Sequence, residues 1–321
     1  MSGGLTLLLL SAGRRVALLE SFRRAAEALD LRLRIVACDL DPEMSAACHA
    51  ADAALRVPCC EDPGYADAIL DLAEREGATL VVPTIDPELA PLAAAAQRFE
   101  ALGARLHLSD ADTVATARDK AVTMRRLAEA GVPTPWTAPL DAVRRDPEAA
   151  RWPLLVKPAG GSAGRGVLLV RDGAELPKSD PEPMIAQAAL EGPEYTVNMF
   201  IDAGGRLRAA IPHRRIRVRA GEVEKGRTER RADLAEFARR IAAALPGARG
   251  VLCFQAIDDR KAGPAVFELN ARFGGGYPLA ERAGGAFARW LLEEAADRPP
   301  TASDDWREGV TMLRYDAAVF V

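Results

Sequence analysis

The sequence has little of the residue types that mark several classes of protein. Aromatic residues make up 5% of the 321 residues and the formal net charge is -4, so neither a base-stacking platform nor a basic field for nucleic acid is expected. The five cysteines are an odd number without C-x-x-C spacing, and the three histidines are scattered. We therefore expect reduced thiols and neither a disulfide framework nor a zinc or histidine metal centre.

Long apolar segments are also lacking. The run LTLLLL at residues 5–10 is soon followed by Arg14 and Arg15, is too short to cross a bilayer and has no basic residue before it. We interpret it as a buried first strand and predict a cytoplasmic protein without a membrane partner. Hydrophobic residues make up 49% and charged residues 27%, as in globular proteins, and the length predicts two or three domains.

Strand-like and helix-like segments alternate in the first third of the chain. This rhythm predicts a parallel sheet with helices on both faces. The dinucleotide fingerprint G-x-G-x-x-G is missing after the first strand, where the chain reads SAGRRV, so NAD is not expected. The predicted strands are 5–10, 34–39, 79–83 and 106–108, and the predicted helices are 16–29, 65–76 and 88–102.

Ligands of open parallel sheets bind beyond the carboxyl ends of the strands. Several polar residues of the first third of the chain fall at such ends and are candidates for a substrate site, although each could equally serve as a turn or cap residue. They are Ser11, Gly13, Arg14, Asp39, Asp86 and Glu88.

The remainder of the chain reads differently. A helical stretch at residues 110–131 and the linker VPTP lead into short strands that alternate as antiparallel strands do. We expect a domain boundary near residues 110–118. The predicted strands are 154–158, 167–170, 184–188, 194–201, 251–257 and 265–270, and the predicted helices are 233–245 and 286–296.

Three residues near the end of the last predicted strand share one face. Glu268, Asn270 and Arg272 are spaced two apart, and side chains at i and i+2 of a strand point to the same side. A carboxylate beside an amide oxygen is a hard oxygen pair that suits Mg²⁺, and a guanidinium suits phosphate. Taken alone, the pair could equally be an ordinary hydrogen-bonded strand pair.

Residues 160–166 form a glycine-rich turn between two short strands. The segment GGSAGRG lacks the Gly-Lys-Ser/Thr that opens a helix in a P-loop, yet its backbone N–H groups could enclose phosphate oxygens. The alternative is a mobile hairpin tip. Lys157 precedes the turn within an apolar strand, where burial of an ammonium group favours an anionic ligand. Lys120 is either a second such lysine or a surface charge.

Residues 213–231 are strongly basic, and a charge run of this kind is usually a solvated face. Arg215, Arg217 and Arg219 alternate as on one strand face. Lys225 could lie at the mouth of a phosphate site.

Taken in order, these segments resemble the ATP-grasp superfamily, and most closely its carbamoyl-phosphate-synthase-like branch. The segments that carry the resemblance are ARDK at 117–120, LLVKPAGGSAGRGV at 154–167, QAALEGPEYTV at 187–197, CFQ at 253–255 and FELNARFGGG at 267–276. The resemblance implies an α/β and α+β fold with three parts. These are an N-terminal parallel-sheet (Rossmann-like) domain at 1–115, a lid domain at 116–188 and an antiparallel-sheet domain with a metal site at 189–321.

The resemblance also implies roles for individual residues. Lys120 and Lys157 would contact ATP phosphates beneath a flap that contains Gly160, Gly161, Ser162, Gly164 and Gly166. Gln187, Ala188 and Ala189 would frame adenine, and Glu194 would bind ribose. Two Mg²⁺ ions, or Mn²⁺, would be bound by Gln255, Glu268 and Asn270. Arg272, Lys157 and Lys225 would be catalytic.

The activity implied is ATP-dependent ligation. A carboxylate substrate would be activated as an acyl phosphate and joined to an amine or thiol, as in ligases that form C–N bonds, in a possible homodimer. One alternative is a phosphotransferase that makes an acyl phosphate or phosphorylates a small molecule, and another is a non-catalytic ATP-binding module. Two features depart from the family: Gln187 stands where relatives often have Glu, and the chain has one ATP-grasp half, whereas carbamoyl phosphate synthases have two.

Overall fold

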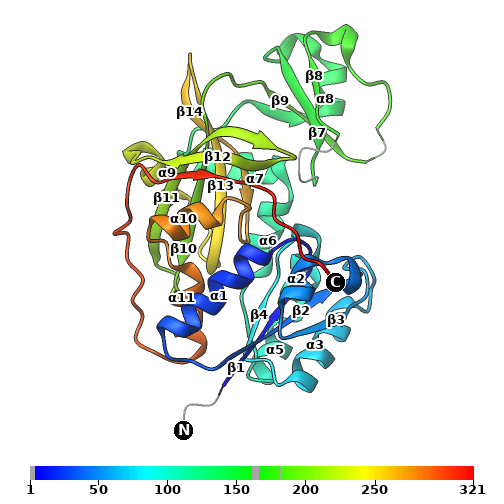
Figure 1. Cartoon of the computed structure of the whole chain (residues 1–321). Helices are drawn as coiled ribbons and strands as arrows, with labels where there is room; N and C mark the ends of the chain where they lie inside the picture. Colours follow the sequence, from blue (N-terminus) through cyan, green and yellow to red (C-terminus); the bar gives the residue numbers. More distant parts are fainter. Residues whose placement is uncertain (1–3, 161–165, 181) are drawn as a thin grey trace.

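The computed structural model describes residues 4–160, 166–180 and 182–321, which form three sheets surrounded by helices (Figure 1). The first sheet is parallel and has the strand order β3-β2-β1-β4-β5, which confirms the predicted α/β start of the chain. Its strands are β1 (Leu5–Leu9), β2 (Leu33–Asp39), β3 (Ala53–Arg56), β4 (Leu80–Val82) and β5 (Arg105–Leu106).

Helices cover both faces of this sheet. Leu7 and Leu9 of β1 pack with α1 on one face, whereas Leu8 packs with α3, α4 and α5 on the other, so alternation along the strand fills two cores. The predicted helix at 88–102 is in fact two helices that meet at Ala95. The elements are α1 (Val16–Ala28), η1 (Pro42–Met44), α2 (Ala46–Ala50), α3 (Tyr65–Glu76), η2 (Asp86–Glu88), α4 (Leu89–Ala94) and α5 (Ala96–Ala101).

The second sheet is small and stands apart from the other two (Figure 1). It is antiparallel, has the order β6-β9-β7-β8, and buries Leu154 and Val156 of β7 against Leu140 and Val143 of α8. Its elements are β6 (Thr137–Pro139), α8 (Leu140–Arg145), η3 (Pro147–Ala149), β7 (Leu154–Pro158), β8 (Leu168–Val170), η4 (Gly173–Glu175) and β9 (Met184–Ala188). We call this part the lid.

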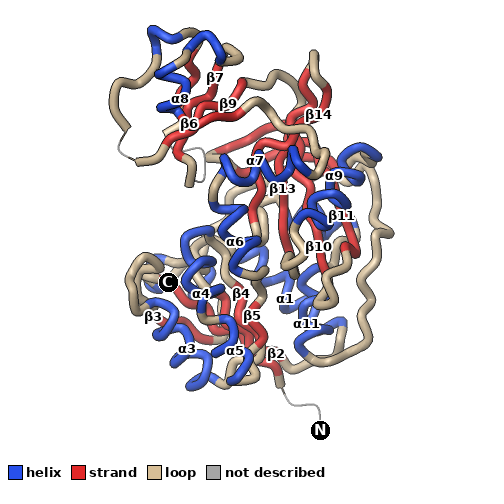
Figure 2. The backbone as a smooth tube through the Cα atoms, turned by 180° about the vertical axis from the view of Figure 1, so that it is seen from behind, coloured by secondary structure: helices blue, strands red, loops and turns tan. Residues whose placement is uncertain are grey.

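The third sheet is antiparallel and has the order β14-β13-β10-β11-β12-β15. One face is covered by α6, α7 and α9 (Figure 2). The other carries α10 and α11. The elements are β10 (Glu194–Ile201), β11 (Leu207–Arg219), β12 (Glu222–Thr228), α9 (Ala232–Ala244), β13 (Gly250–Asp259), β14 (Gly263–Asn270), α10 (Tyr277–Ala283), α11 (Phe287–Ala295) and β15 (Thr311–Leu313).

The first and third sheets share a hydrophobic core. Leu7 of β1 and Phe22 of α1 belong to the same buried cluster as Phe200 of β10 and Phe287 and Trp290 of α11. Burial of this apolar surface favours a fixed placement of the N-terminal sheet against the large sheet. The ends of β1 and β4 consequently lie near β14, where the polar residues of both domains meet.

The helical stretch predicted at 110–131 is broken in two at Asp119. The side chain of this residue accepts hydrogen bonds from the backbone N–H groups of Ala121 and Val122, so it ends α6 (Ala111–Arg118) and caps α7 (Lys120–Glu129). Leu127 of α7 packs in the core of the large sheet, not in the lid, although residue 116 was the predicted start of the lid domain. The cap places Lys120 at the first turn of α7.

Candidate active site

A cavity of about 570 Å³ lies where the three sheets converge. Six cationic side chains and four carboxylates line it, in contrast to the net charge of -4 of the whole chain. Such a cavity attracts anions. The cations are Arg14, Arg15, Lys120, Lys157, Arg215 and Arg272, and the carboxylates are Asp86, Glu194, Glu222 and Glu268.

One wall of the cavity is formed by β14. Gln255 of β13 pairs with Glu268, but the next residue, Ala256, pairs with Val266, so Phe267 is the extra residue of a β-bulge. Because of the bulge, Phe267 and Glu268 both line the cavity, while Val266 and Leu269 are buried in the core. Asn270 and Arg272 follow Glu268 on the cavity side, as their spacing predicted.

Gln255 links two charged residues of the large sheet. When its amide is oriented so that both of its groups find partners, the nitrogen donates to Glu268 Oε2 at 3.3 Å and the oxygen accepts from Arg215 at 3.2 Å. The guanidinium of Arg215 also donates to Thr196 Oγ1 and to the Gly221 carbonyl. Gln255 thus lies between Glu268 and Arg215, and its role as a metal ligand stays a prediction.

Glu268 and Asn270 fit a magnesium site that a nucleotide completes. Both line the cavity through hard oxygen donors on one face of β14. Within the described ranges there is no group of three or more His, Cys, Asp or Glu side chains that could hold a metal ion by itself. Mg²⁺ commonly binds through one or two protein ligands together with water and phosphate oxygens. The donor set is therefore suited to Mg²⁺ that arrives with ATP.

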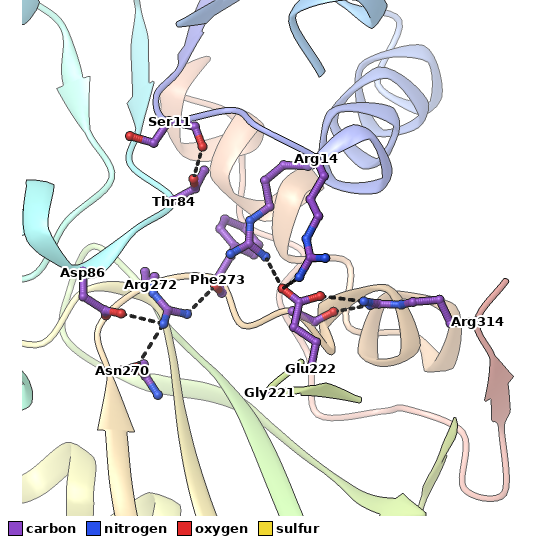
Figure 3. A network of polar contacts seen from close by, with 12 residues as sticks. Ser11, Arg14, Thr84, Asp86, Gly221, Glu222, Asn270, Arg272, Phe273 and Arg314 are labelled. Carbon is purple, nitrogen blue, oxygen red and sulfur yellow. Dashed lines mark hydrogen bonds and ion pairs between the residues drawn. The ribbon is translucent and has the colours of Figure 1, made fainter. Parts of the chain in front are cut away.

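Arg272 connects β14 to the N-terminal domain. Its guanidinium donates to Asp86 Oδ2 at 2.7 Å, to Asn270 Oδ1 at 3.1 Å and to the Phe273 carbonyl at 3.0 Å (Figure 3). Burial works against its charge, but Asp86 and Glu268 outweigh burial and raise the pKa of Arg272. The side chain is thus a fixed positive charge where the two domains meet.

Lys157 extends from the lid toward β14. Its Nζ donates to Gln187 Oε1 at 2.8 Å, and the Gln187 amide donates to Thr137 Oγ1 at 3.0 Å. Burial lowers the pKa of Lys157 to about 8, with Glu268 opposing the shift and Lys120 adding to it. Burial also lowers the pKa of Lys120, again opposed by Glu268. The carboxylate of Glu268 thus raises the pKa of two lysines from different elements, against the effect of burial.

The family models decide the affiliation of the chain. Residues 117–276 match the model of the ATP-grasp domain. The chain belongs to the ATP-grasp family. Residues 7–107 match the model described as PylC-like, N-terminal domain. No curated protein matches the chain. The assignment of this ATP-grasp chain to the carbamoyl-phosphate-synthase-like branch stays a prediction.

Solved structures of several ligases and carboxylases have the same fold as this chain, and three of them are compared with it below. The biotin carboxylase domain of 2-oxoglutarate carboxylase from Hydrogenobacter thermophilus, in complex with MgADP and bicarbonate, has a TM-score of 0.75 at 21% identity over 96% of this chain and 74% of that one. The L-amino acid ligase from Bacillus licheniformis has a TM-score of 0.71 at 19% identity over 96% of this chain and 78% of that one. N5-carboxyaminoimidazole ribonucleotide synthetase from Thermotoga maritima has a TM-score of 0.69 at 16% identity over 94% of this chain and 78% of that one.

Two of the three predicted adenine-side residues line the cavity of this ATP-grasp chain. Gln187 and Ala188 line it, together with the apolar Leu190. The Ala188 N–H donates to the Trp136 carbonyl and the Ala189 N–H to the Pro153 carbonyl. Ala189 is not one of the described residues that line the cavity. Other apolar residues that line the cavity include Leu155, Val167, Ile257 and Phe267.

Glu194 lies opposite Arg215 on the large sheet. The two side chains form an ion pair with 3.0 Å between Arg215 Nε and Glu194 Oε1. Burial raises the pKa of Glu194, and Arg215 counteracts this rise. The sequence placed Arg215 and Arg217 on the same strand face, but the side chain of Arg215 is 7% exposed whereas that of Arg217 is 64% exposed. Arg215 is therefore a cavity residue that the sequence did not reveal.

Two predicted parts of the site are not seen at the cavity, for different reasons. Lys225 on β12 is exposed and is not one of the described residues lining the cavity, since its strand position faces solvent. In the predicted flap, Gly161, Ser162 and Gly164 fall outside the described residues. Gly160 and Gly166 flank that segment, and Gly166 has a left-handed φ of +70°, which favours glycine.

The N-terminal candidates divide into cavity and support residues. Glu88 is fully buried and accepts hydrogen bonds from the Ser11 and Tyr65 hydroxyls and the Thr84 and Ile85 N–H groups. Ser11 is held at a left-handed φ of +45°. Arg14 and Asp86 line the cavity. Ser11, Gly13, Asp39 and Glu88 are not among its lining residues in the described structure, and we assign them to the support of the turn.

No helix among the described residues has the length and apolar character that a membrane crossing requires.

Proposed function

We propose that the protein is an ATP- and Mg²⁺-dependent ligase that activates a carboxylate as an acyl phosphate and joins it to an amine or thiol. The supporting observation is the convergence of three elements on one cavity. Lys157 of the lid and Lys120 of α7 both respond electrostatically to Glu268 of β14, and Arg272 lies beside the same strand. Such an arrangement of cations around oxygen donors suits the transfer of a phosphoryl group.

In this proposal the nucleotide lies between the lid and the large sheet. Its purine lies near the apolar residues Ala188 and Leu190, with Glu194 available to its ribose. Lys157 and Lys120 contact the phosphates, for which the glycine-rich turn was predicted as a cover. Glu268 and Asn270 would hold one or two Mg²⁺ ions, or Mn²⁺ in their place. The metal would supply positive charge beside the phosphates.

The reaction then proceeds in two transfers. A substrate carboxylate oxygen attacks the γ-phosphorus of ATP, the bond to the β-phosphate oxygen breaks, and ADP leaves. Lys157, Lys120 and Arg272 offset the negative charge that accumulates. An amine or thiol next attacks the acyl carbon, phosphate leaves, and the nucleophile gives up a proton. Exclusion of water by the closed lid protects the acyl phosphate from hydrolysis.

The decisive experiment is a phosphate-release screen of carboxylates against amines and thiols with MgATP, in which product masses are measured. A ligase releases phosphate and yields a condensed product only when both partners are present. Formation of ADP and a stable acyl phosphate from the carboxylate alone would instead establish the phosphotransferase. Binding of MgATP without turnover across the screen would favour the non-catalytic module. The Glu268→Gln protein provides the inactive control for the ligase outcome.

A further inference from the structure

Two arginines stand at the N-terminal end of α1 and face the cavity. Arg15 is the N-cap residue of α1, Arg14 precedes it, and both line the cavity. The N-terminus of a helix carries partial positive charge and is stabilised by anions. The first helical residues, 16–19, read VALL and supply no acidic group. Two cations at this end disfavour the folded protein unless an anion compensates them.

Among the described residues, the carboxylate of Glu222 forms ion pairs with both arginines, and it also contacts a third arginine, Arg314. Glu222 Oε1 lies 3.5 Å from a guanidinium nitrogen of Arg14 and 3.6 Å from one of Arg15. Glu222 Oε2 accepts a hydrogen bond from Arg314 at 2.6 Å (Figure 3). The neighbouring carboxylate of Asp86 is engaged by Arg272. The three guanidinium groups around Glu222 therefore retain an excess of two positive charges.

The N–H donors of the first two arginines are also uncommitted. Arg314 donates to Glu222 and to the Gly275 carbonyl, so its guanidinium serves the fold. Within the part of the chain that the structure describes, Arg14 and Arg15 donate no side-chain hydrogen bond and contact Glu222 only at ion-pair distances. A guanidinium offers five donors, and Arg15, with a side chain 21% exposed, is largely removed from water.

We propose that Arg14 and Arg15 form an oxyanion subsite for a second negatively charged group, a carboxylate or a phosphate, on the substrate that the enzyme activates. This subsite rests on the proposed ligase function. Arg15 interacts electrostatically with Arg272 and Asp86, so it adjoins the place where the first carboxylate meets ATP. The substrate class is therefore a dianion, with one anionic group at Arg272 and the other at the N-terminus of α1.

The test is calorimetric titration of the protein saturated with MgADP, at constant ionic strength. The probes are glutarate with two carboxylates, valerate with one carboxylate on the same carbon chain, and 3-phosphoglycerate with a carboxylate and a phosphate. Glutarate should bind about tenfold more tightly than valerate, as expected for one added charge pair, and 3-phosphoglycerate, whose phosphate adds between one and two charges, should also bind more tightly than valerate. The preference between glutarate and 3-phosphoglycerate distinguishes the carboxylate from the phosphate.

The variants Arg14→Gln and Arg15→Gln should each reduce this preference, with Arg15→Gln removing most of it. The matched control is Arg23→Gln on the same helix, because Arg23 pairs with Glu20 and Asp52 outside the cavity. Equal binding of glutarate and valerate, or an unchanged preference in Arg15→Gln, would overturn the subsite. Failure of the wild type to bind MgADP would overturn the ligase proposal itself, whereas MgADP binding without a dianion preference overturns only the subsite.

Discussion

Lys157 Nζ and Gln187 Oε1 are 2.8 Å apart, so the nearest partner of the buried ammonium group is a neutral amide. A carboxylate at this position would neutralise the lysine. The amide leaves its charge in place, and burial lowers the pKa of Lys157 to about 8. The lysine is therefore a positive charge that remains available to a phosphate, and it titrates close to neutral pH.

Nucleotide affinity should depend on this titration. Bound phosphates favour the ammonium form, so the pKa of Lys157 is higher in the complex than the value of about 8 in the free protein. MgADP affinity should be at its maximum below about pH 8, the pKa of Lys157 in the free protein. It should fall above this pH, because binding then requires uptake of a proton. Calorimetry between about pH 6.5 and about pH 9.5, in buffers of different ionisation enthalpy, measures both the affinity and the proton uptake.

Two substitutions at the same position serve as controls for the pH dependence. Lys157→Arg keeps a positive charge throughout this range and should bind MgADP without the decline above pH about 8. Lys157→Met should bind weakly at every pH. A decline that persists in Lys157→Met would assign the titration to another group, and Lys120 is the first alternative because burial lowers its pKa too.

Glu268 is the only carboxylate of the proposed metal-binding pair, and its replacement should abolish metal binding without unfolding the protein. Glu268→Gln keeps the shape of the side chain but removes its charge, so Mg²⁺ should no longer strengthen ADP binding and ATP turnover should be lost. Calorimetry with and without Mg²⁺ measures the first effect, and phosphate release measures the second. Glu191→Gln is the control, since Glu191 is an exposed carboxylate near the same sheet. Turnover at the wild-type rate in Glu268→Gln would refute the metal assignment.

The ion pair between Arg272 and Asp86 should contribute to stability as well as to turnover. Both side chains are 15% exposed, so Asp86→Asn leaves a largely buried guanidinium without its counter-charge. We expect a loss of about 2–4 kcal/mol in the free energy of unfolding, measured in urea. ATP turnover should fall sharply while MgADP affinity changes little, because Arg272 acts on the carboxylate substrate.

The exposed pair between Asp67 and Arg98 provides a matched control in the same domain. Both side chains are more than half exposed, so Asp67→Asn should change the free energy of unfolding by about 0–1 kcal/mol. Equal losses in Asp86→Asn and Asp67→Asn would mean that the domain junction does not depend on the Asp86 ion pair.

The parts of the site that follow from local periodicity could be predicted from the sequence. Glu268, Asn270 and Arg272 share a face because strand alternation is a local property, and Lys157 is buried because its strand is apolar on both sides. The bulge at Phe267 was not foreseen, since it arises from the pairing of β13 with β14, and no residue type marks it.

Residues placed by tertiary contacts escaped prediction. Arg215 and Arg217 have the same charge in the same run, but a register shift between them lets one enter the cavity and leaves the other in solvent. Glu222 and Arg15 come from different domains, and their pairing requires the core that α1 shares with the large sheet. Lys225 was assigned to the site from its place in the basic run, which could not reveal that this position of β12 faces solvent.

The neutral residue at position 187 should itself control the pH range of nucleotide binding. In Gln187→Glu, a carboxylate would lie beside Lys157 Nζ, stabilise the ammonium form and raise the pKa of the lysine. The decline in MgADP affinity should then move to higher pH, while the affinity at neutral pH should fall by about tenfold because the new carboxylate repels the phosphates. Gln187→Met, which is similar in volume and uncharged, controls for loss of the hydrogen bond and should leave the decline at or below its wild-type pH. If Gln187→Glu binds MgADP with wild-type affinity and an unshifted decline, Lys157 does not contact the phosphates.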